Sequence, residues 1–129
     1  MKEKILVVED NQRNMRLIEM ALQAGGYTLL KAADGEAALA MALQGRPELI
    51  IMDIQLPKMT GLEVVSRLRK MPEFSQTLII AITAYAMKED EEKCLKAGCD
   101  AYLAKPINTR ELPRVVDEML RGREKGGPW

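Results

Sequence analysis

Five polar side chains stand at the ends of short apolar runs in the sequence. The runs are rich in Val, Ile and Leu, and the polar residues that end them are Glu9, Asp10, Asp53, Thr83 and Lys105. Three carboxylates, a hydroxyl and an ammonium group could together bind a divalent cation and stabilise the charge on a phosphoryl group. This chemistry requires a fold that brings the five side chains to one place.

The apolar runs alternate with segments of helical periodicity, which is typical of buried parallel strands in an α/β protein. We expect strands at Ile5–Val8, Tyr27–Ala32, Leu49–Met52, Leu78–Thr83 and Tyr102–Ala104. A strand–helix alternation repeated five times predicts a three-layer, doubly wound sandwich with a five-stranded parallel sheet. The expected strand order is 2-1-3-4-5, as in flavodoxin-like folds.

Capping residues mark the expected helix ends. Asn11 and Asp34 are predicted N-caps of the first and second helices. Asn108-Thr109-Arg110-Glu111 has the form of a capping box for the last helix. The fourth helix is predicted from about Met87 to Ala97, because a glycine follows.

In such a sheet, ligands bind outside the carboxyl ends of the strands where the strand order reverses. The reversal lies between the first and third strands, which lead into Asp10 and Asp53. Glu9, Asp10 and Asp53 bring three negative charges against the single positive charge of Lys105, so a divalent cation would balance the site. All-oxygen ligands with room for water and phosphate oxygens favour Mg²⁺, and Mn²⁺ is expected to substitute for it.

Asp53 stands alone at its strand end, without a second acid beside it, and is the predicted nucleophile for phosphoryl transfer. Each of the five polar residues, taken singly, could instead be a helix cap or a solvated loop residue. Their joint position at the carboxyl ends of strands favours a functional site.

Composition limits the partners. The chain has 129 residues and equal numbers of basic and acidic side chains, 19 each, which suits one globular domain without a bulk attraction to nucleic acid or membrane. No apolar run approaches the roughly 20 residues of a membrane span, and no signal peptide is apparent. A cytoplasmic location is therefore expected.

The chain contains no histidine, so a Ser-His-Asp or Cys-His apparatus is excluded, and any histidine chemistry must come from a partner. Cys94 and Cys99 lack the companions of a usual zinc site. We expect both to be buried, reduced thiols.

Four segments resemble the receiver domain of two-component response regulators. They are Val7-Val8-Glu9-Asp10-Asn11, Met52-Asp53-Ile54-Gln55-Leu56-Pro57, Ile82-Thr83-Ala84 and Ala104-Lys105-Pro106. The likeness covers about residues 3–121 and leaves a short C-terminal tail, 122–129. The resemblance implies that the predicted α/β sandwich has the fold of a receiver domain.

The resemblance also implies roles for individual residues. Asp53 would accept a phosphoryl group from a phosphohistidine of a histidine kinase or a histidine phosphotransferase. Asp10 and Asp53 would bind Mg²⁺ directly, Glu9 through water, and Gln55 through its backbone carbonyl.

Further roles implied by the resemblance concern the response to phosphorylation. Thr83 and Lys105 would contact the phosphoryl oxygens, and the peptide between Lys105 and Pro106 would be cis. Tyr102 would turn inward when Thr83 moves. The surface that changes would be the face formed by the fourth helix, the fifth strand and the fifth helix.

A narrower likeness is to single-domain cell-cycle regulators of the DivK type, although receiver domains of hybrid kinases share many of the same residues. It rests on Val8-Glu9-Asp10-Asn11-x-x-Asn14, Asp53-Ile54-Gln55-Leu56-Pro57, Gly61-Leu62-Glu63-Val64 and Thr83-Ala84-Tyr85-Ala86-Met87-Lys88.

Three roles remain open. They are a stand-alone switch acting on a downstream protein, a phosphorelay intermediate or phosphate sink, and a receiver fragment of a hybrid histidine kinase. The start at Met1 favours a complete protein. An enzyme with small-molecule turnover is least favoured, because the site has a nucleophile without a separate general base.

Two further predictions concern partner docking and the lifetime of the phosphorylated state. An apolar patch of Asn14, Met15, Ile18, Pro106 and Ile107 would receive the phosphodonor. Alternatively, Met15 and Ile18 simply face the sheet.

Gln55 and Tyr85 are expected to flank the path of the water that hydrolyses phosphorylated Asp53. Tyr85 would shield the bond because its side chain is bulky and uncharged, unless it points away over the fourth helix.

Overall fold

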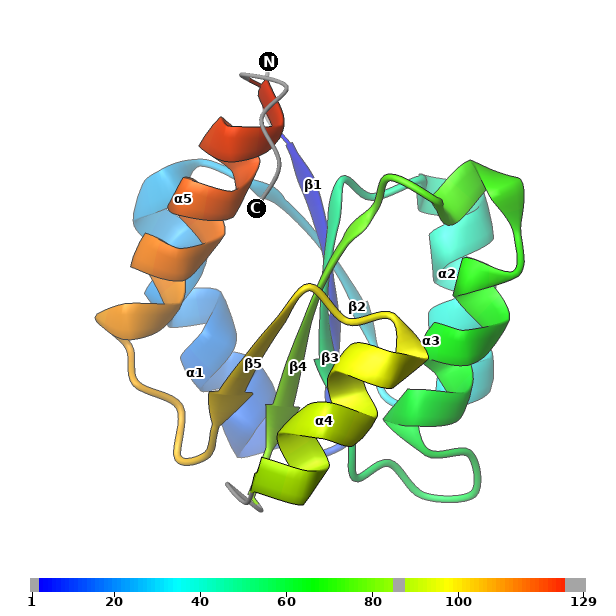
Figure 1. Cartoon of the computed structure of the whole chain (residues 1–129). Helices are drawn as coiled ribbons and strands as arrows, with labels where there is room; N and C mark the ends of the chain where they lie inside the picture. The colour runs from blue at the N-terminus through cyan, green and yellow to red at the C-terminus, as the bar shows by residue number, and fades with distance from the viewer. Residues whose placement is uncertain (1–2, 85–87, 125–129) are drawn as a thin grey trace.

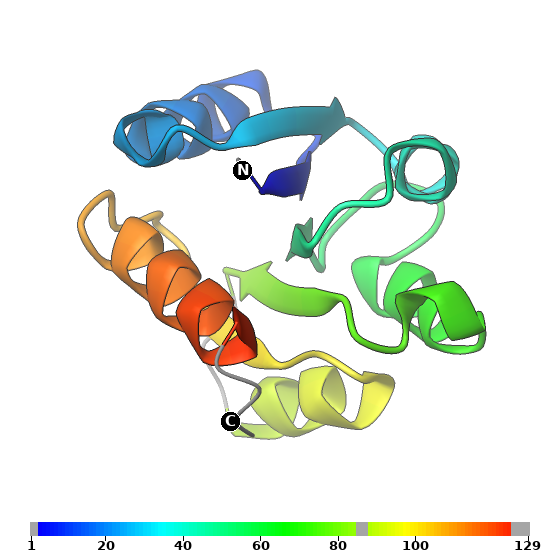
Figure 2. The same cartoon turned by 90° about the horizontal axis from the view of Figure 1, so that it is seen from above.

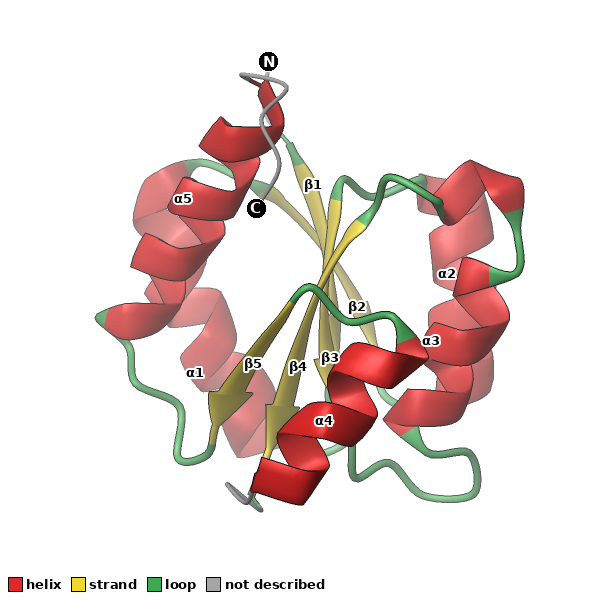
Figure 3. Cartoon of the chain, viewed as in Figure 1, coloured by secondary structure: helices red, strands yellow, loops and turns green. Residues whose placement is uncertain are grey.

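Five parallel strands form one sheet in the order β2-β1-β3-β4-β5 in the computed structural model, which describes residues 3–84 and 88–124. The strands are β1 (Lys4–Val8), β2 (Thr28–Ala32), β3 (Leu49–Asp53), β4 (Leu78–Thr83) and β5 (Ala101–Ala104). Figure 3 shows that their carboxyl ends lie together at one end of the molecule, where loops lead into the next helices. The predicted fold class and strand order are confirmed.

Helices connect the strands and cover both faces of the sheet (Figure 1). They are α1 (Gln12–Leu22), α2 (Gly35–Gly45), α3 (Gly61–Arg69), α4 (Lys88–Ala97) and α5 (Glu111–Glu124), with 3₁₀ turns at Gln23–Gly25 and Pro72–Phe74. Seen from above, α1 and α5 lie on one face, and α2, α3 and α4 lie on the other (Figure 2). This is the three-layer arrangement expected from the alternating sequence.

The sheet separates two apolar cores because successive strand residues point to opposite faces. Leu6 and Val8 pack on the side of α2, α3 and α4, whereas Ile5 and Val7 pack on the side of α1 and α5. With both faces covered, central strands read as continuous apolar runs, and every residue of β3 is buried.

Local capping explains where the helices begin. The side chain of Asn11 accepts a hydrogen bond from Asn14 N at 3.0 Å, and Asp34 Oδ1 accepts one from Ala37 N at 2.8 Å. Asn108 Oδ1 accepts hydrogen bonds from Arg110 N and Glu111 N, both at 2.9 Å. The predicted N-caps are thus confirmed, while the predicted start of the fourth helix at Met87 lies outside the described residues.

The end of the last helix differs from the prediction. Residues 122–129 were expected to form a tail, but α5 continues to Glu124. Gly122 falls within the helix, where glycine costs only about 1 kcal/mol relative to alanine and does not by itself end a helix.

The side chain of Arg69 ties together the end of the molecule opposite the strand carboxyl ends. Its guanidinium donates to the carbonyls of Phe74 and Thr77, both at 2.7 Å, and of Gly98 at 2.9 Å. It also pairs with Asp100 Oδ2 at 2.9 Å. Gly98 has φ +116, and a Cβ there would lie 2.6 Å from the Arg69 side chain, so this close approach requires glycine.

Cys94 and Cys99 are free and buried, as predicted. Burial raises the pKa of Cys99 to about 12 and also raises that of Cys94, so both thiols stay protonated near neutral pH. Among the described helices, none is long and apolar enough to cross a membrane.

Candidate functional site

Strand register brings the predicted site residues to one edge of the sheet. Val8 pairs with Met52, so Glu9, directly after β1, comes next to Asp53, the last residue of β3. Thr83 pairs with Ala104, which places Lys105 one residue beyond the pair. The Lys105 N–H donates to the Thr83 carbonyl at 2.7 Å and extends this ladder. Parallel pairing therefore gathers the ends of four strands at one edge.

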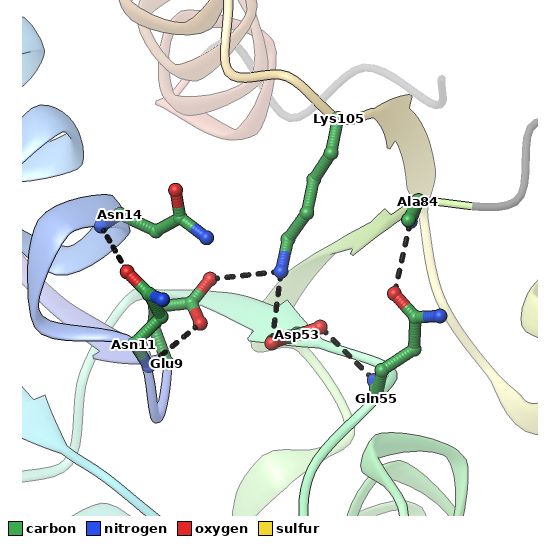
Figure 4. Close-up of polar contacts among 7 residues, drawn as sticks. All are labelled: Glu9, Asn11, Asn14, Asp53, Gln55, Ala84 and Lys105. Atoms are coloured by element: carbon green, nitrogen blue, oxygen red, sulfur yellow. Dashed lines mark hydrogen bonds and ion pairs between the residues drawn. The ribbon is translucent and has the colours of Figure 1, made fainter.

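Asp53 is buried, with 2% of its surface exposed, and each of its oxygens has a partner. Oδ2 lies 3.0 Å from Lys105 Nζ, and Oδ1 accepts from Gln55 N at 2.9 Å (Figure 4). The backbone N–H and the ammonium group fix the orientation of this carboxylate, whose oxygens are the nucleophile that phosphoryl transfer requires.

Glu9 lies on the other side of Lys105. Its Oε1 is 3.1 Å from Lys105 Nζ, and its Oε2 accepts from Asn11 N at 3.1 Å. Burial raises the pKa of Glu9 to about 7, and the charge of Asp53 adds to this rise against the lowering by Asn11 N–H and Lys105. The charged form of Glu9 is therefore less stable here than that of a glutamate exposed to water.

Lys105 is the cation that lies between the two buried acids and pairs with both. Burial by itself lowers the pKa of Lys105, but its contacts with Asp53 and Glu9 outweigh that effect and raise the pKa. The side chain consequently remains a charged ammonium group. The peptide that joins Lys105 to Pro106 is cis.

Three carboxylates fit a metal ion. Glu9, Asp10 and Asp53 each offer one oxygen within 4.8 Å of the others, and Asp10 is exposed at the rim. Among residues 3–84 and 88–124, the buried Glu9 Oε1 has no hydrogen-bond donor beyond its ion pair. An all-oxygen donor set with a net negative charge suits a hard divalent cation such as Mg²⁺.

The two predicted switch residues lie on neighbouring strands. Thr83 is buried at the carboxyl end of β4, with 2% of its surface exposed. Tyr102 is half-buried on β5 and packs against the core beneath α2, α3 and α4. Burial raises the pKa of Tyr102, as do nearby acids of α4, so its phenol is neutral. Thr83 thus ends the strand beside the site, and Tyr102 shares a core with α4.

Comparison with known proteins agrees with this geometry. The family model of the response regulator receiver domain matches residues 5–117. The chain belongs to this family. Receiver domains are signalling modules of two-component systems rather than small-molecule enzymes.

Relatives of this receiver domain include named regulators. It is 43% identical over 117 residues to the polar-differentiation response regulator DivK of Brucella anthropi, covering 91% of this chain and 93% of that protein. The corresponding Brucella ovis protein is 42% identical with the same coverage.

Solved structures show the same fold. A CheY-like receiver domain protein from Methanospirillum hungatei has a TM-score of 0.89 at 32% identity, over 98% of this chain and 100% of that one. The receiver domain of a sensor histidine kinase from Pseudomonas aeruginosa has a TM-score of 0.83 at 38% identity, over 92% and 97%. That structure has a magnesium ion coordinated in its active site cleft.

The predicted docking patch of the receiver domain is only partly on the surface. Ile18 is 1% exposed and lies in the core between α1 and the sheet, so its inclusion in the patch was wrong. Met15 and Ile107 are half-buried against the same core, and Asn14 is half-buried. Pro106 is exposed, so an accessible patch without Ile18 remains.

A groove of about 510 Å³ opens beside the acids of the receiver site. It runs between α1 and β2, and its lining includes Glu9, Asp10 and Arg16. An ion pair between Lys31 and Glu19, 3.2 Å apart, lies along it. The groove is on the β2 side of α1, and neither Pro106 nor Ile107 lines it.

Two contacts of the receiver site were missed from the sequence. The Asn11 N–H holds Glu9, and the Gln55 side chain accepts a hydrogen bond from Ala84 N at 3.0 Å. The predicted shielding residue Tyr85 lies outside the described residues. The first contact uses a backbone N–H that any residue except proline supplies, so no residue type indicates it, and no local pattern indicates the second.

Proposed function

We propose that this receiver domain, residues 3–121, acts as a stand-alone response regulator that is phosphorylated on Asp53. The donor is a phosphohistidine on a partner histidine kinase or histidine phosphotransferase. One observation carries the proposal, which is the buried Asp53 carboxylate facing the Lys105 ammonium at 3.0 Å beside two further acids. The likeness to DivK of Brucella anthropi, which extends over 93% of that protein, supports the stand-alone role.

The chemistry is a transfer between two nucleophiles. An oxygen of the Asp53 carboxylate attacks phosphorus, the donor's phosphorus–nitrogen bond breaks, and its electron pair stays on the imidazole. Lys105, which pairs with Asp53, would neutralise charge on a phosphoryl oxygen, and Thr83 would contribute a hydroxyl from the neighbouring strand end.

Asp10 and Asp53 would hold Mg²⁺ directly, with Glu9 acting through water and Gln55 through its carbonyl. When bound, the ion supplies positive charge to the phosphoryl oxygens, and Mn²⁺ should do the same. Without it, the three acids repel an incoming phosphoryl dianion.

The output would be a change on the face of α4, β5 and α5. Movement of Thr83 toward the phosphoryl group would leave space that Tyr102 fills, because both side chains lie on adjacent strands beside α4. A protein that binds only the rearranged face would read the signal.

The phosphodonor would dock over Asn14, Met15, Pro106 and Ile107, beside the site entrance. Exposed Pro106 is the residue most open to a partner. Substituting Pro106 should slow transfer from a kinase while labelling by a small phosphodonor continues.

A second candidate role is that of a phosphorelay intermediate, a phosphate sink or a receiver segment of a hybrid kinase. The 38% identity to the receiver domain of a sensor histidine kinase favours this role. A long lifetime of phosphorylated Asp53 would favour a switch, and a short one a phosphate sink. Shielding of the phosphoryl bond by Gln55 and Tyr85 would make the lifetime long. Phosphate release from wild type and Tyr85→Ala measures that shielding.

Intact-mass spectrometry after incubation with acetyl phosphate tests the proposed function. Wild type and the surface control Asp117→Asn should each gain one phosphoryl group with Mg²⁺ and none with a chelator. Asp53→Asn should gain none. Equal labelling of wild type and Asp53→Asn would contradict the assignment of the nucleophile.

A further inference from the structure

The pairing of β3 with β4 changes partners just beyond Asp53. Ile54 N donates to Ile82 O at 3.0 Å and thus continues the parallel ladder. In a regular parallel ladder, the Ile54 carbonyl would then accept from Ala84 N, because Ala84 lies two residues after Ile82 on the neighbouring strand. Instead, Ile54 O accepts from Gly61 N at 3.0 Å.

Gly61 makes this exchange possible. A Cβ at Gly61 would lie 2.3 Å from Asp53 O and 2.8 Å from the Ile54 Cα, so only glycine lets the first turn of α3 approach so closely. The approach uses the Ile54 carbonyl and leaves the Ala84 N–H without its backbone partner.

The Gln55 carboxamide takes the place of the missing backbone carbonyl. Its Oε1 accepts from Ala84 N at 3.0 Å, while the backbone N–H of Gln55 donates to Asp53 Oδ1 at 2.9 Å (Figure 4). One residue therefore connects the nucleophile to the segment that follows Thr83. We call the contact between Gln55 Oε1 and Ala84 N the Gln55 latch.

We infer that the Gln55 latch is a positioning device that opens when Asp53 carries a phosphoryl group. The inference rests on the proposed function. A phosphoryl oxygen is an anionic acceptor, and charge-assisted hydrogen bonds are roughly twice as strong as neutral ones, so it competes with a neutral carboxamide for the Ala84 N–H. Until then, the latch holds the residue next to Thr83 in its unphosphorylated position and opposes activation.

Hydrogen exchange of the Ala84 amide in the metal-free protein tests the latch itself. Gln55→Met has nearly the same side-chain length without an acceptor, whereas Gln55→Glu retains an acceptor oxygen. Loss of one neutral hydrogen bond should speed exchange about fivefold in Gln55→Met, with protection retained in Gln55→Glu. Equal exchange rates in wild type and Gln55→Met would overturn the inference.

Affinity for beryllofluoride with Mg²⁺, measured by NMR titration, tests the opening. Gln55→Met should bind this phosphoryl mimic roughly three- to tenfold more tightly than wild type, because no latch has to open. Equal or weaker binding by Gln55→Met would overturn the latch and leave the proposed function intact. A wild type that ignores beryllofluoride would contradict the proposed function, and with it the opening step.

Discussion

The Nζ atom of Lys105 lies 3.0 Å from Asp53 Oδ2, so the residue after β5 neutralises the residue that ends β3. The same ammonium group is 3.1 Å from Glu9, and both acids are buried. One cation on a third strand end thus holds two carboxylates together. This dependence leads to a first prediction.

Lys105→Met should destabilise the metal-free protein by about 1–3 kcal/mol, because two buried acids lose their common counter-charge. Mg²⁺ should recover part of the loss, since the cation replaces the missing charge. Urea unfolding with and without Mg²⁺ measures both effects. The exposed Lys96→Met is the control, and equal stabilities of the two variants would contradict the prediction.

Asp10→Asn should weaken Mg²⁺ binding by about tenfold or more, because one of three carboxylates becomes neutral. Stability without metal should not fall, since Asp10 is exposed and its loss relieves repulsion from Glu9 and Asp53. Isothermal titration with Mg²⁺ measures the affinity. Asp34→Asn keeps a good helix cap and serves as control. If both variants bound Mg²⁺ equally, Asp10 would not be a ligand.

Arg69→Ala should lower the free energy of unfolding by about 3–5 kcal/mol, because three buried or half-buried carbonyls and Asp100 lose their donor. Arg69→Lys should recover only part of this loss, since an ammonium group cannot reproduce the planar guanidinium contacts. Urea denaturation measures both variants. Arg67→Ala, exposed on the same helix, should be nearly neutral. A comparable loss in Arg67→Ala would refute the specific role of Arg69.

Stability should fall as the pH rises above about 8.5, the pKa of an unfolded thiol. Burial raises the pKa of Cys99 to about 12, so the folded state keeps a proton that the unfolded state has lost. The unfolding free energy should therefore drop by about 1 kcal/mol at pH 9.5 from this thiol.

Urea unfolding at pH 8 and at pH 9.5 measures this difference. Cys99→Ala removes the titrating group and should show a shallower pH dependence than wild type. Parallel pH profiles for the two proteins would show that Cys99 does not contribute.

Phosphorylation should be sensed beyond the site through Thr83 and Tyr102. Addition of beryllofluoride and Mg²⁺ should shift NMR signals of Tyr102 and of α4, because Tyr102 lies on the strand next to that of Thr83 and packs in the same core as α4. Thr83→Ala should retain shifts near Asp53 and lose those in α4. Wild-type shifts confined to the site would contradict the switch.

The sequence alone was sufficient to predict the sheet and the group of acids at its edge. Strands and caps depend on neighbouring residues, as with Asn11 and Asp34, and the carboxyl ends of parallel strands must share one edge. Glu9, Asp53 and Lys105 therefore meet wherever this strand order forms. Their chemistry followed from residue type and strand position.

Only the tertiary structure decided contacts that join distant segments. The Gln55 latch depends on how closely α3 approaches Ile54, and the ion pair of Arg69 with Asp100 joins the end of α3 to the residue before β5. Ile18 reads like an exposed partner of Met15, yet the rotation of α1 on the sheet buries it. Such contacts depend on the position of each helix to within a few ångströms. Side-chain packing over the whole core sets that position, and local sequence patterns do not encode it.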